Sequence, residues 1–176
     1  MARHRDGGPA PSRKGSRFEA HTGAQAVDEL RRMAAMGYEH VEMCSPSGYA
    51  PWSFGNLVKY SGKELAAIIR DAGLKCSSSH FTWNELNNNL DERIAFAQQM
   101  GLKHMVASGG LDGKTTDELK RKCEALNKIG EKITKAGMVA GYHNHNGEFE
   151  NKKAQYDQSI TDILRFDNHD QRDIWP

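Results

Sequence analysis

The stretch Ala136-Gly137-Met138-Val139-Ala140-Gly141-Tyr142-His143 decides the fold, because it joins a helical pattern to a short apolar strand through a glycine. A helix that turns at once into a strand commonly ends in the left-handed conformation, which glycine adopts without a Cβ penalty. Three earlier stretches repeat this pattern: Met36-Gly37-Tyr38-Glu39-His40-Val41-Glu42-Met43, Ala72-Gly73-Leu74-Lys75-Cys76-Ser77-Ser78-Ser79-His80 and Met100-Gly101-Leu102-Lys103-His104-Met105-Val106-Ala107-Ser108. The sequence therefore predicts four helix–glycine–strand units in series.

The segments between these strands carry apolar residues at helical spacing. The best formed begins at Thr115-Thr116-Asp117-Glu118, which supplies an N-cap and early acids, and a weaker pattern covers about 156–164. Strands that alternate with helices predict a parallel α/β sheet with right-handed crossovers, either an open doubly wound sheet or a (β/α) barrel. No Gly-x-Gly-x-x-Gly loop follows a strand, so a dinucleotide-binding sheet has no support.

A cluster of chemically useful side chains follows the last strand, in Tyr142-His143-Asn144-His145-Asn146-Gly147-Glu148-Phe149. If the strand continues that far, His143 and His145 share one of its faces. Imidazole and carboxylate together suit a divalent transition metal, and histidine can also move protons near neutral pH. A hydrogen-bonded strand end without any ligand is the alternative, and the octet alone leaves both open.

In a barrel, chemistry sits at the carboxyl ends of the strands. The residues at those ends, besides the last cluster, are Glu42, His80 and Ser108, with Trp83 just beyond His80 and Trp52 and Phe54 in the loop after the first strand. Each has a structural alternative: a loop acid, a strand cap, a Ser-Gly-Gly turn or a packed aromatic loop. The recurrence of polar residues at the same end of each unit is the pattern that a barrel enzyme predicts.

Composition excludes several classes of protein. The 176 residues carry a net charge of +1 from 24 basic and 23 acidic side chains, so bulk charge suggests neither a nucleic-acid nor a membrane partner. The three cysteines match no metal-knuckle spacing and indicate reduced thiols in a cytoplasmic protein. We expect a basic leader over 1–17, without an apolar run for a signal or a membrane span, one domain over 18–165, and a frayed polar tail over 166–176.

Together these units resemble the sugar phosphate isomerase/epimerase family, the xylose isomerase-like TIM barrels that also include endonuclease IV. The resemblance runs from about Phe18 to Leu164 and rests on three pieces of sequence: Met33-Ala34-Ala35-Met36-Gly37-Tyr38-Glu39-His40-Val41-Glu42, Gly73-Leu74-Lys75-Cys76-Ser77-Ser78-Ser79-His80-Phe81, and Tyr142-His143-Asn144-His145 with Glu148-Phe149. It implies a partial (β/α) barrel of about four to five units.

The resemblance also implies a function. In this family a divalent metal (Mn²⁺, Mg²⁺ or Zn²⁺) polarises a sugar or polyol while acid–base groups move a proton through an enediolate. Carried onto this sequence, it makes Glu148 and His145 catalytic candidates and His143 and Glu148 metal candidates. The candidate substrate contacts are Glu42, His80, Trp83 and Ser108.

Departures from the family keep alternatives open. The usual opening strand is replaced by the leader, and the sequence ends where a sixth strand is expected, so the metal is expected to bind weakly or not at all. A keto-sugar or inositol-derivative lyase or dehydratase, and a non-catalytic barrel fragment, are the alternatives; endonuclease IV-like repair is disfavoured by the low charge. Uncovered strand edges predict self-association, most simply as a homodimer.

Overall fold

The structure is a computed structural model that describes residues 23–52, 54–113 and 115–145. Within these ranges one sheet contains four parallel strands in the order of the sequence: β1 (Met43–Cys44), β2 (Ser78–Thr82), β3 (His104–Ser108) and β4 (Val139–His143). The sequential order and parallel pairing are those of consecutive βα units in a barrel. The predicted α/β class is confirmed, and the four described parallel strands agree with the predicted partial barrel of about four to five units.

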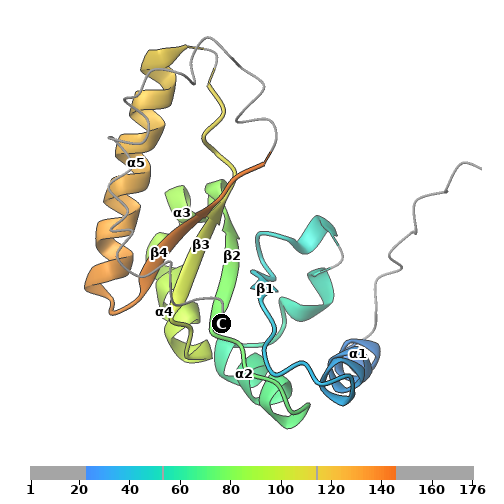
Figure 1. Ribbon diagram of the computed structural model, residues 1–176. Helices are drawn as coiled ribbons and strands as arrows, with labels where there is room; N and C mark the ends of the chain where they lie inside the picture. The colour runs from blue at the N-terminus through green and yellow to red at the C-terminus, as the bar shows by residue number, and fades with distance from the viewer. Residues whose placement is uncertain (1–22, 53, 114, 146–176) are drawn as a thin grey trace, which may run out of the picture.

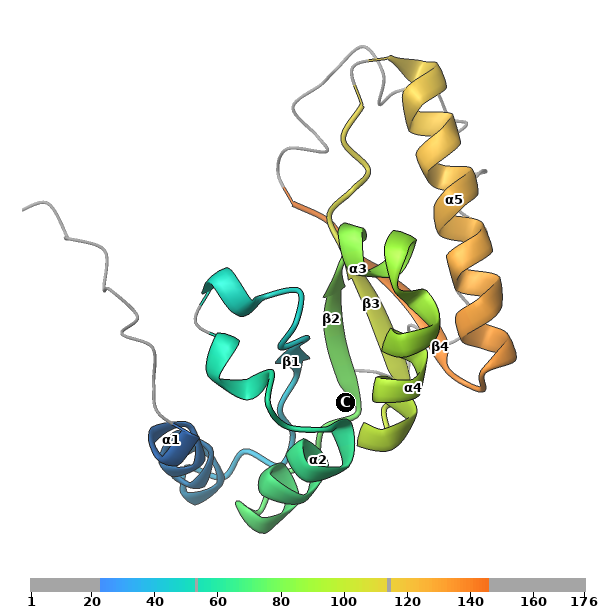
Figure 2. The same ribbon diagram turned by 180° about the vertical axis from the view of Figure 1, so that it is seen from behind.

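Helices connect the strands, and those that follow β2 lie toward one face of the sheet (Figures 1 and 2). Among the described residues the opposite face carries no helix, and we call it the open face. The helices are α1 (Gly23–Ala35), α2 (Gly62–Asp71), α3 (Trp83–Asn88), α4 (Leu90–Met100) and α5 (Thr116–Lys135), with short 3₁₀ turns η1 (Ala50–Trp52) and η2 (Gly55–Leu57) after β1.

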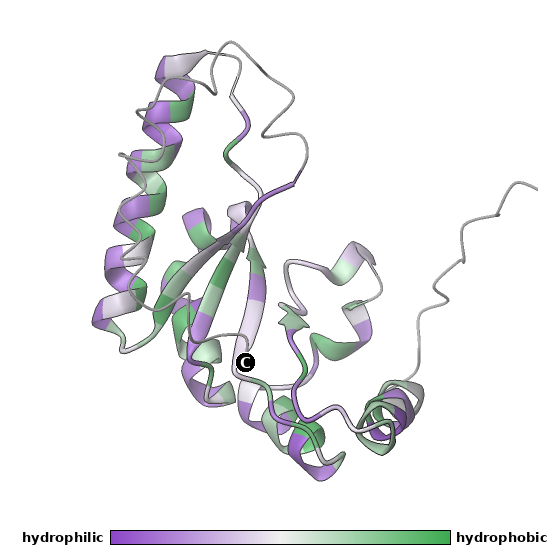
Figure 3. Ribbon diagram, in the orientation of Figure 1, coloured by the Kyte–Doolittle hydropathy of each residue, from purple (hydrophilic) through white to green (hydrophobic). Residues whose placement is uncertain are grey.

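The core lies between the sheet and these helices. Phe81 of β2 and Met105 of β3 are fully buried, and α5 buries one stripe of side chains, which Figure 3 shows as green residues recurring along the helix. That stripe is the one predicted from the sequence: Leu119, Cys123, Leu126, Ile129 and Ile133. Thr115 caps α5 by accepting a hydrogen bond from the backbone N–H of Glu118, as the sequence also predicts.

The four predicted glycine positions are confirmed. Gly37, Gly73, Gly101 and Gly137 all have positive φ, between 74° and 94°. Each ends a helix in the left-handed region, where a side chain would be strained, so the chain can turn at once toward the next strand.

Two predicted elements differ from the structure. The first strand is shorter than its predicted stretch: an isolated bridge joins His40 to Lys75, and regular pairing begins only at Met43. A short helix, α3, also interrupts the third unit before α4, because Thr82 and Glu85 form a capping box directly at the end of β2. The predicted helix over 156–164, the leader and the polar tail lie outside the described residues.

Candidate functional site

The open face of the sheet gathers most of the candidate residues that are described. In β2 the half-buried Ser78, His80 and Thr82 alternate with the buried Ser79 and Phe81, which lie on the helix face. Parallel partners in register point to the same face, so Ser108 and His143 lie level with Thr82. The carboxyl ends of β2, β3 and β4 therefore present polar side chains to one side.

Three imidazoles lie in a row at this end of the sheet. The ring centroids of His80 and His143 are 4.7 Å apart, and those of His143 and His145 are 4.8 Å apart. His80 of β2 and His143 of β4 meet across β3, with which both of these strands pair. His143 and His145 also lie within contact of one another, although β4 ends at His143 and does not continue to His145 as the shared strand face would require. We call these three side chains the imidazole row.

Glu42, the residue that directly precedes β1, lies beside the imidazole row. Its Oε1 lies 3.4 Å from His80 Nε2 and accepts a hydrogen bond of 2.5 Å from the Ser78 hydroxyl. The Glu42 side chain is 48% exposed, whereas that of His80 is 18% exposed. The carboxylate thus remains open to solvent while it holds one side of a half-buried imidazole.

The environment of His80 favours its neutral form. Burial lowers the pKa of this imidazole, the neighbouring His143 and His145 lower it further, and Glu42 opposes the shift. Desolvation and like charges both disfavour a protonated ring, while a carboxylate favours it. His80 can therefore accept a proton at neutral pH, which is what a general base requires.

Ser108 has a partner that the sequence analysis did not predict. Its hydroxyl hydrogen-bonds the phenol of Tyr49, which comes from the loop after β1 and therefore reaches past β2 to the end of β3. Burial raises the pKa of Tyr49, an effect that the hydrogen bond from Ser108 partly offsets. The aromatic composition of the loop, with Trp52 and Phe54, was the only signal in the sequence for this contact.

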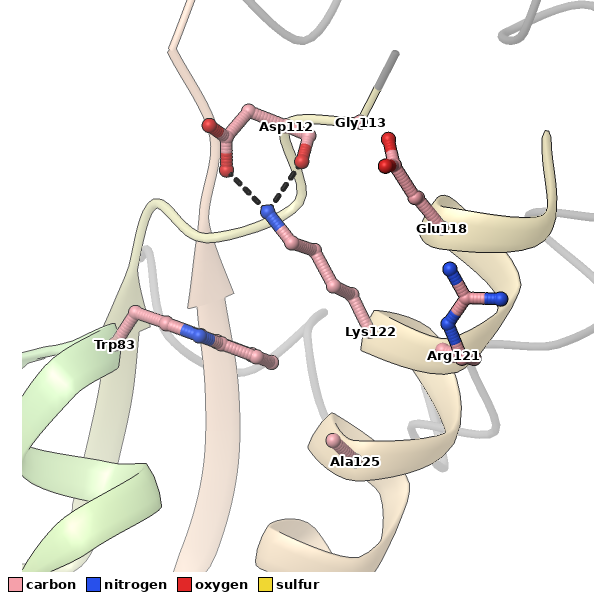
Figure 4. A pocket seen from close by; sticks show the side chains of 7 residues that line it. All are labelled: Trp83, Asp112, Gly113, Glu118, Arg121, Lys122 and Ala125. Atoms are coloured by element: carbon pink, nitrogen blue, oxygen red, sulfur yellow. Dashed lines mark hydrogen bonds and ion pairs between the residues drawn. The ribbon is translucent and has the colours of Figure 1, made fainter. Parts of the chain in front are cut away.

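Trp83 does not lie on the open face with the other candidate residues. It follows Thr82 as the first residue of α3, and strand alternation places position 83 with Ser79 and Phe81 toward the helix face. Its indole borders a cavity of about 640 Å³ on the side of α5, opposite Lys122 and Ala125 (Figure 4). Lys122 there donates hydrogen bonds to the backbone carbonyl and carboxylate of Asp112, which lowers the pKa of Asp112.

Comparison with known proteins places this geometry in a family. The sequence model of the xylose isomerase-like TIM barrel matches residues 30–169, which is most of the chain. The chain belongs to the xylose isomerase-like TIM barrel family. A search of curated proteins found no match.

Solved structures of the same fold agree with this membership. A sugar phosphate isomerase/epimerase from Parabacteroides distasonis is 27% identical, with a TM-score of 0.61 over 72% of this chain and 48% of its own. A second such protein from that organism is 23% identical (TM-score 0.59; 79% of this chain, 57% of its own), and an L-ribulose 3-epimerase is 18% identical (0.54; 72% and 46%). The chain thus spans about half the length of these relatives.

The described donor atoms of this xylose isomerase-like chain do not by themselves form a site for a divalent metal. Among residues 23–52, 54–113 and 115–145, no three histidine, cysteine, aspartate or glutamate side chains come together as metal ligands. His143 and His145 are described, but Glu148, the predicted carboxylate ligand and catalytic group, lies outside the described residues. A divalent metal would need at least one further ligand beyond the described side chains.

Two further sequence predictions concern the environment of the protein. Cys44, Cys76 and Cys123 are all free thiols, and burial raises the pKa of Cys76 to about 11. In the part of the chain that the structure describes, no helix combines the length and the apolar composition needed to cross a bilayer. Even α5, with 20 residues, carries charged side chains along its whole length.

Proposed function

We propose that this chain provides the proton-transfer half of a sugar isomerase or epimerase site, acting on a sugar or polyol through an enediolate. The observation that carries the proposal is the position of His80, between Glu42 and His143 on the open face at the carboxyl ends of the strands. Membership of the xylose isomerase-like family and the likeness to a sugar phosphate isomerase/epimerase support the same chemistry.

The proposed step moves one proton and keeps the electron count unchanged. His80, neutral because its pKa is lowered, takes the proton from the carbon next to the substrate carbonyl, and the electron pair moves onto the carbonyl oxygen as an enediolate. Delivery of the proton to the neighbouring carbon, while the hydroxyl proton of the enediolate passes from one oxygen to the other, gives an isomer. Delivery of a proton by the second acid–base group to the opposite face of the original carbon gives an epimer, and His80 keeps the proton it took until solvent removes it. Glu42 stabilises the imidazolium formed in between, because its carboxylate lies 3.4 Å from His80 Nε2.

In this proposal His145 and Glu148 are the candidates for the second acid–base group. His145 lies in the imidazole row, next to His143. A divalent metal, when bound, would supply Lewis-acid polarisation of the substrate oxygen. The substrate hydroxyls would meet Glu42, which lies beside His80, and Ser108, which is the partner in register of His143.

The test follows exchange of solvent deuterium into a ketose. Proton NMR of D-fructose, D-ribulose and D-ribulose 5-phosphate in D₂O reports loss of the signal at the carbon next to the carbonyl. We expect His80→Gln to slow the exchange by about 10²-fold or more, the usual contribution of a general base. His104→Gln is the matched control, because His104 lies on the same face at the opposite end of β3.

The outcomes separate the candidate reactions. Equal exchange in His80→Gln and the wild type, or no exchange by the wild type with any of the three probes, contradicts the proposal. Appearance of a dehydrated product instead of an exchanged sugar assigns the chain to the alternative class of lyase or dehydratase.

A further inference from the structure

Glu85 is a buried carboxylate with more contacts than a helix cap needs. The residue is 6% exposed, and its Oε2 accepts hydrogen bonds from the Thr82 backbone N–H at 2.9 Å and the Thr82 hydroxyl at 3.1 Å. These bonds complete the capping box of α3. Its Oε1 accepts a third bond of 2.5 Å from the hydroxyl of Ser45, and a fourth, at 3.5 Å, from Arg93 Nη1.

Two of the additional contacts, with Ser45 and with Gly48, are made by the loop that follows β1, and the third is made by Arg93 of α4. Ser45, the first residue of that loop, is fully buried, and its backbone N–H donates to the carbonyl of His80 at 2.8 Å. Gly48 lies directly on Glu85, since a Cβ at position 48 would overlap the carboxylate. The loop is therefore seated on a charged group beneath it, and only glycine fits at the point of closest approach.

Burying a carboxylate is unfavourable unless it is paired and hydrogen-bonded. The guanidinium of Arg93, whose side chain is 14% exposed, provides the opposite charge for Glu85. The other capping box in the described part of the chain, formed by Ser61 and Glu64, caps α2 in the same way, but the carboxylate of Glu64 is exposed. Capping alone thus does not account for the burial of Glu85 against Ser45 and Gly48.

The seated loop carries an aromatic cluster toward the candidate site. The ring of Tyr49 lies 5.6 Å from that of Trp52 and 6.2 Å from that of Phe54, measured between centroids. Tyr49 directly follows Gly48 and hydrogen-bonds Ser108, whose partner in register is His143. A shift of the loop at Gly48 therefore moves the Tyr49 hydroxyl relative to the imidazole row.

We propose that Glu85 is a positioning residue that seats the loop over 45–57 above the candidate site, and that Tyr49 on this loop is a specificity-determining residue that contacts a hydroxyl of the sugar. The second part rests on the proposed function. Tyr49 suits the task because its phenol can donate to and accept from a hydroxyl, and its ring is held by two aromatic neighbours. Glu85 acts on the substrate only through the loop.

The seating of the loop is tested by hydrogen–deuterium exchange of the full chain, read by mass spectrometry. We expect Glu85→Gln and Gly48→Ala to speed exchange in peptides covering 45–57 by at least about tenfold, with α5 unchanged. Glu64→Gln is the control, because it alters a capping box of the same design that is exposed on α2. Unchanged exchange over 45–57 in both variants overturns the proposal, and so does faster exchange throughout the chain, which would mark Glu85 as merely structural.

The role of Tyr49 is tested with the ketose that the wild type turns over. We expect Tyr49→Phe, which removes only the hydroxyl, to raise KM at least fivefold with kcat within twofold and an unchanged pH profile. An unchanged KM overturns this part. If the wild type exchanges deuterium into none of the three ketoses, both the proposed function and the role of Tyr49 are rejected. The backbone hydrogen–deuterium exchange experiment still decides, independently, whether Glu85 seats the loop.

Discussion

The imidazoles of His80 and His143 lie with their ring centroids 4.7 Å apart, although they come from strands β2 and β4 that do not pair with each other. Their contact passes over β3, whose residues Val106 and Ser108 lie on the same face. Parallel strands two positions apart are separated by about 10 Å, so the two side chains must lean toward one another. The contact brings two titratable rings together at the end of the sheet where barrel enzymes carry out chemistry.

The first prediction concerns the pH dependence of stability. The pKa of His80 in the folded chain is lowered from about 6.5, chiefly by burial, so the unfolded chain binds more protons just below that pH. Stability is therefore lost as pH falls from about 6.5 through the lowered pKa, and it is fully present above. We expect His80→Gln to remove part of this acid sensitivity, measured by urea unfolding between pH 7.5 and 5 with a chelator present.

The control for this experiment is again His104→Gln, which removes an imidazole from the other end of the open face. It should leave the pH dependence of the free energy of unfolding close to that of the wild type. If both variants follow the wild-type curve, His80 is not held neutral by the fold.

A second prediction concerns metal affinity. Because no three described side chains form a ligand set, we expect Mn²⁺ and Zn²⁺ to bind weakly, through His143 and the carboxylate of Glu148. Calorimetric titration should show affinity at least about tenfold lower in the His143→Ala/Glu148→Ala double variant. His104→Ala/Glu124→Ala removes the same two residue types elsewhere and should bind as the wild type does. Equal affinity in all three proteins would remove these residues as ligands.

The repeated glycine pattern made the fold predictable. A helix that must turn at once into a strand needs a left-handed residue, and the sequence marks that position four times with glycine. Helical spacing then predicts the buried stripe of α5, and strand ends predict Glu42, His80, Ser108 and His143 on one face. These are local rules that act within a few residues, so a single sequence is sufficient to apply them.

The packing of the loop after β1 onto Glu85 could not be predicted by such local rules. Glu85 looks like an ordinary capping-box acid in the sequence, and its contacts with Ser45 and Gly48 depend on how two units pack. Tyr49 likewise reaches Ser108 past a whole strand. Trp83 was predicted beside His80 as a substrate contact, yet the chain enters α3 at this residue and the indole borders the cavity near α5.

A third prediction tests the glycine rule at Gly101, the C-cap of α4 with φ 74° and ψ 27°. No atom lies within 4 Å of a Cβ built there, so a substitution acts through the backbone alone. We expect Gly101→Ala to destabilise the chain by about 1–2 kcal/mol, the usual penalty of the left-handed region, and Gly101→Asn by less, because asparagine tolerates it. Chemical denaturation measures both. Equal stability of the alanine variant and the wild type would contradict the helix-to-strand rule.

The last prediction is that the 176-residue chain self-associates. Within the described residues β1 and β4 each have one paired side only, and parallel strands are rarely left uncovered at an edge and on one face. The open face is largely polar where it is described, and Val139 of β4 is its most exposed large apolar residue, at 49%. Edge pairing, assisted by this valine, is therefore the expected driving force.

Val139 offers a matched test of that association. Val139→Lys places a charge on the open face of an edge strand, which opposes pairing between copies. Val58→Lys is the control, because Val58 is equally exposed, at 48%, but follows η2 and lies away from β4. Light scattering on freshly purified protein across a range of concentrations should give a mass above that of the 19.7 kDa monomer for the wild type and Val58→Lys, and a lower mass for Val139→Lys. A wild type that stays monomeric at every concentration and unfolds cooperatively would show that the chain covers its own edges.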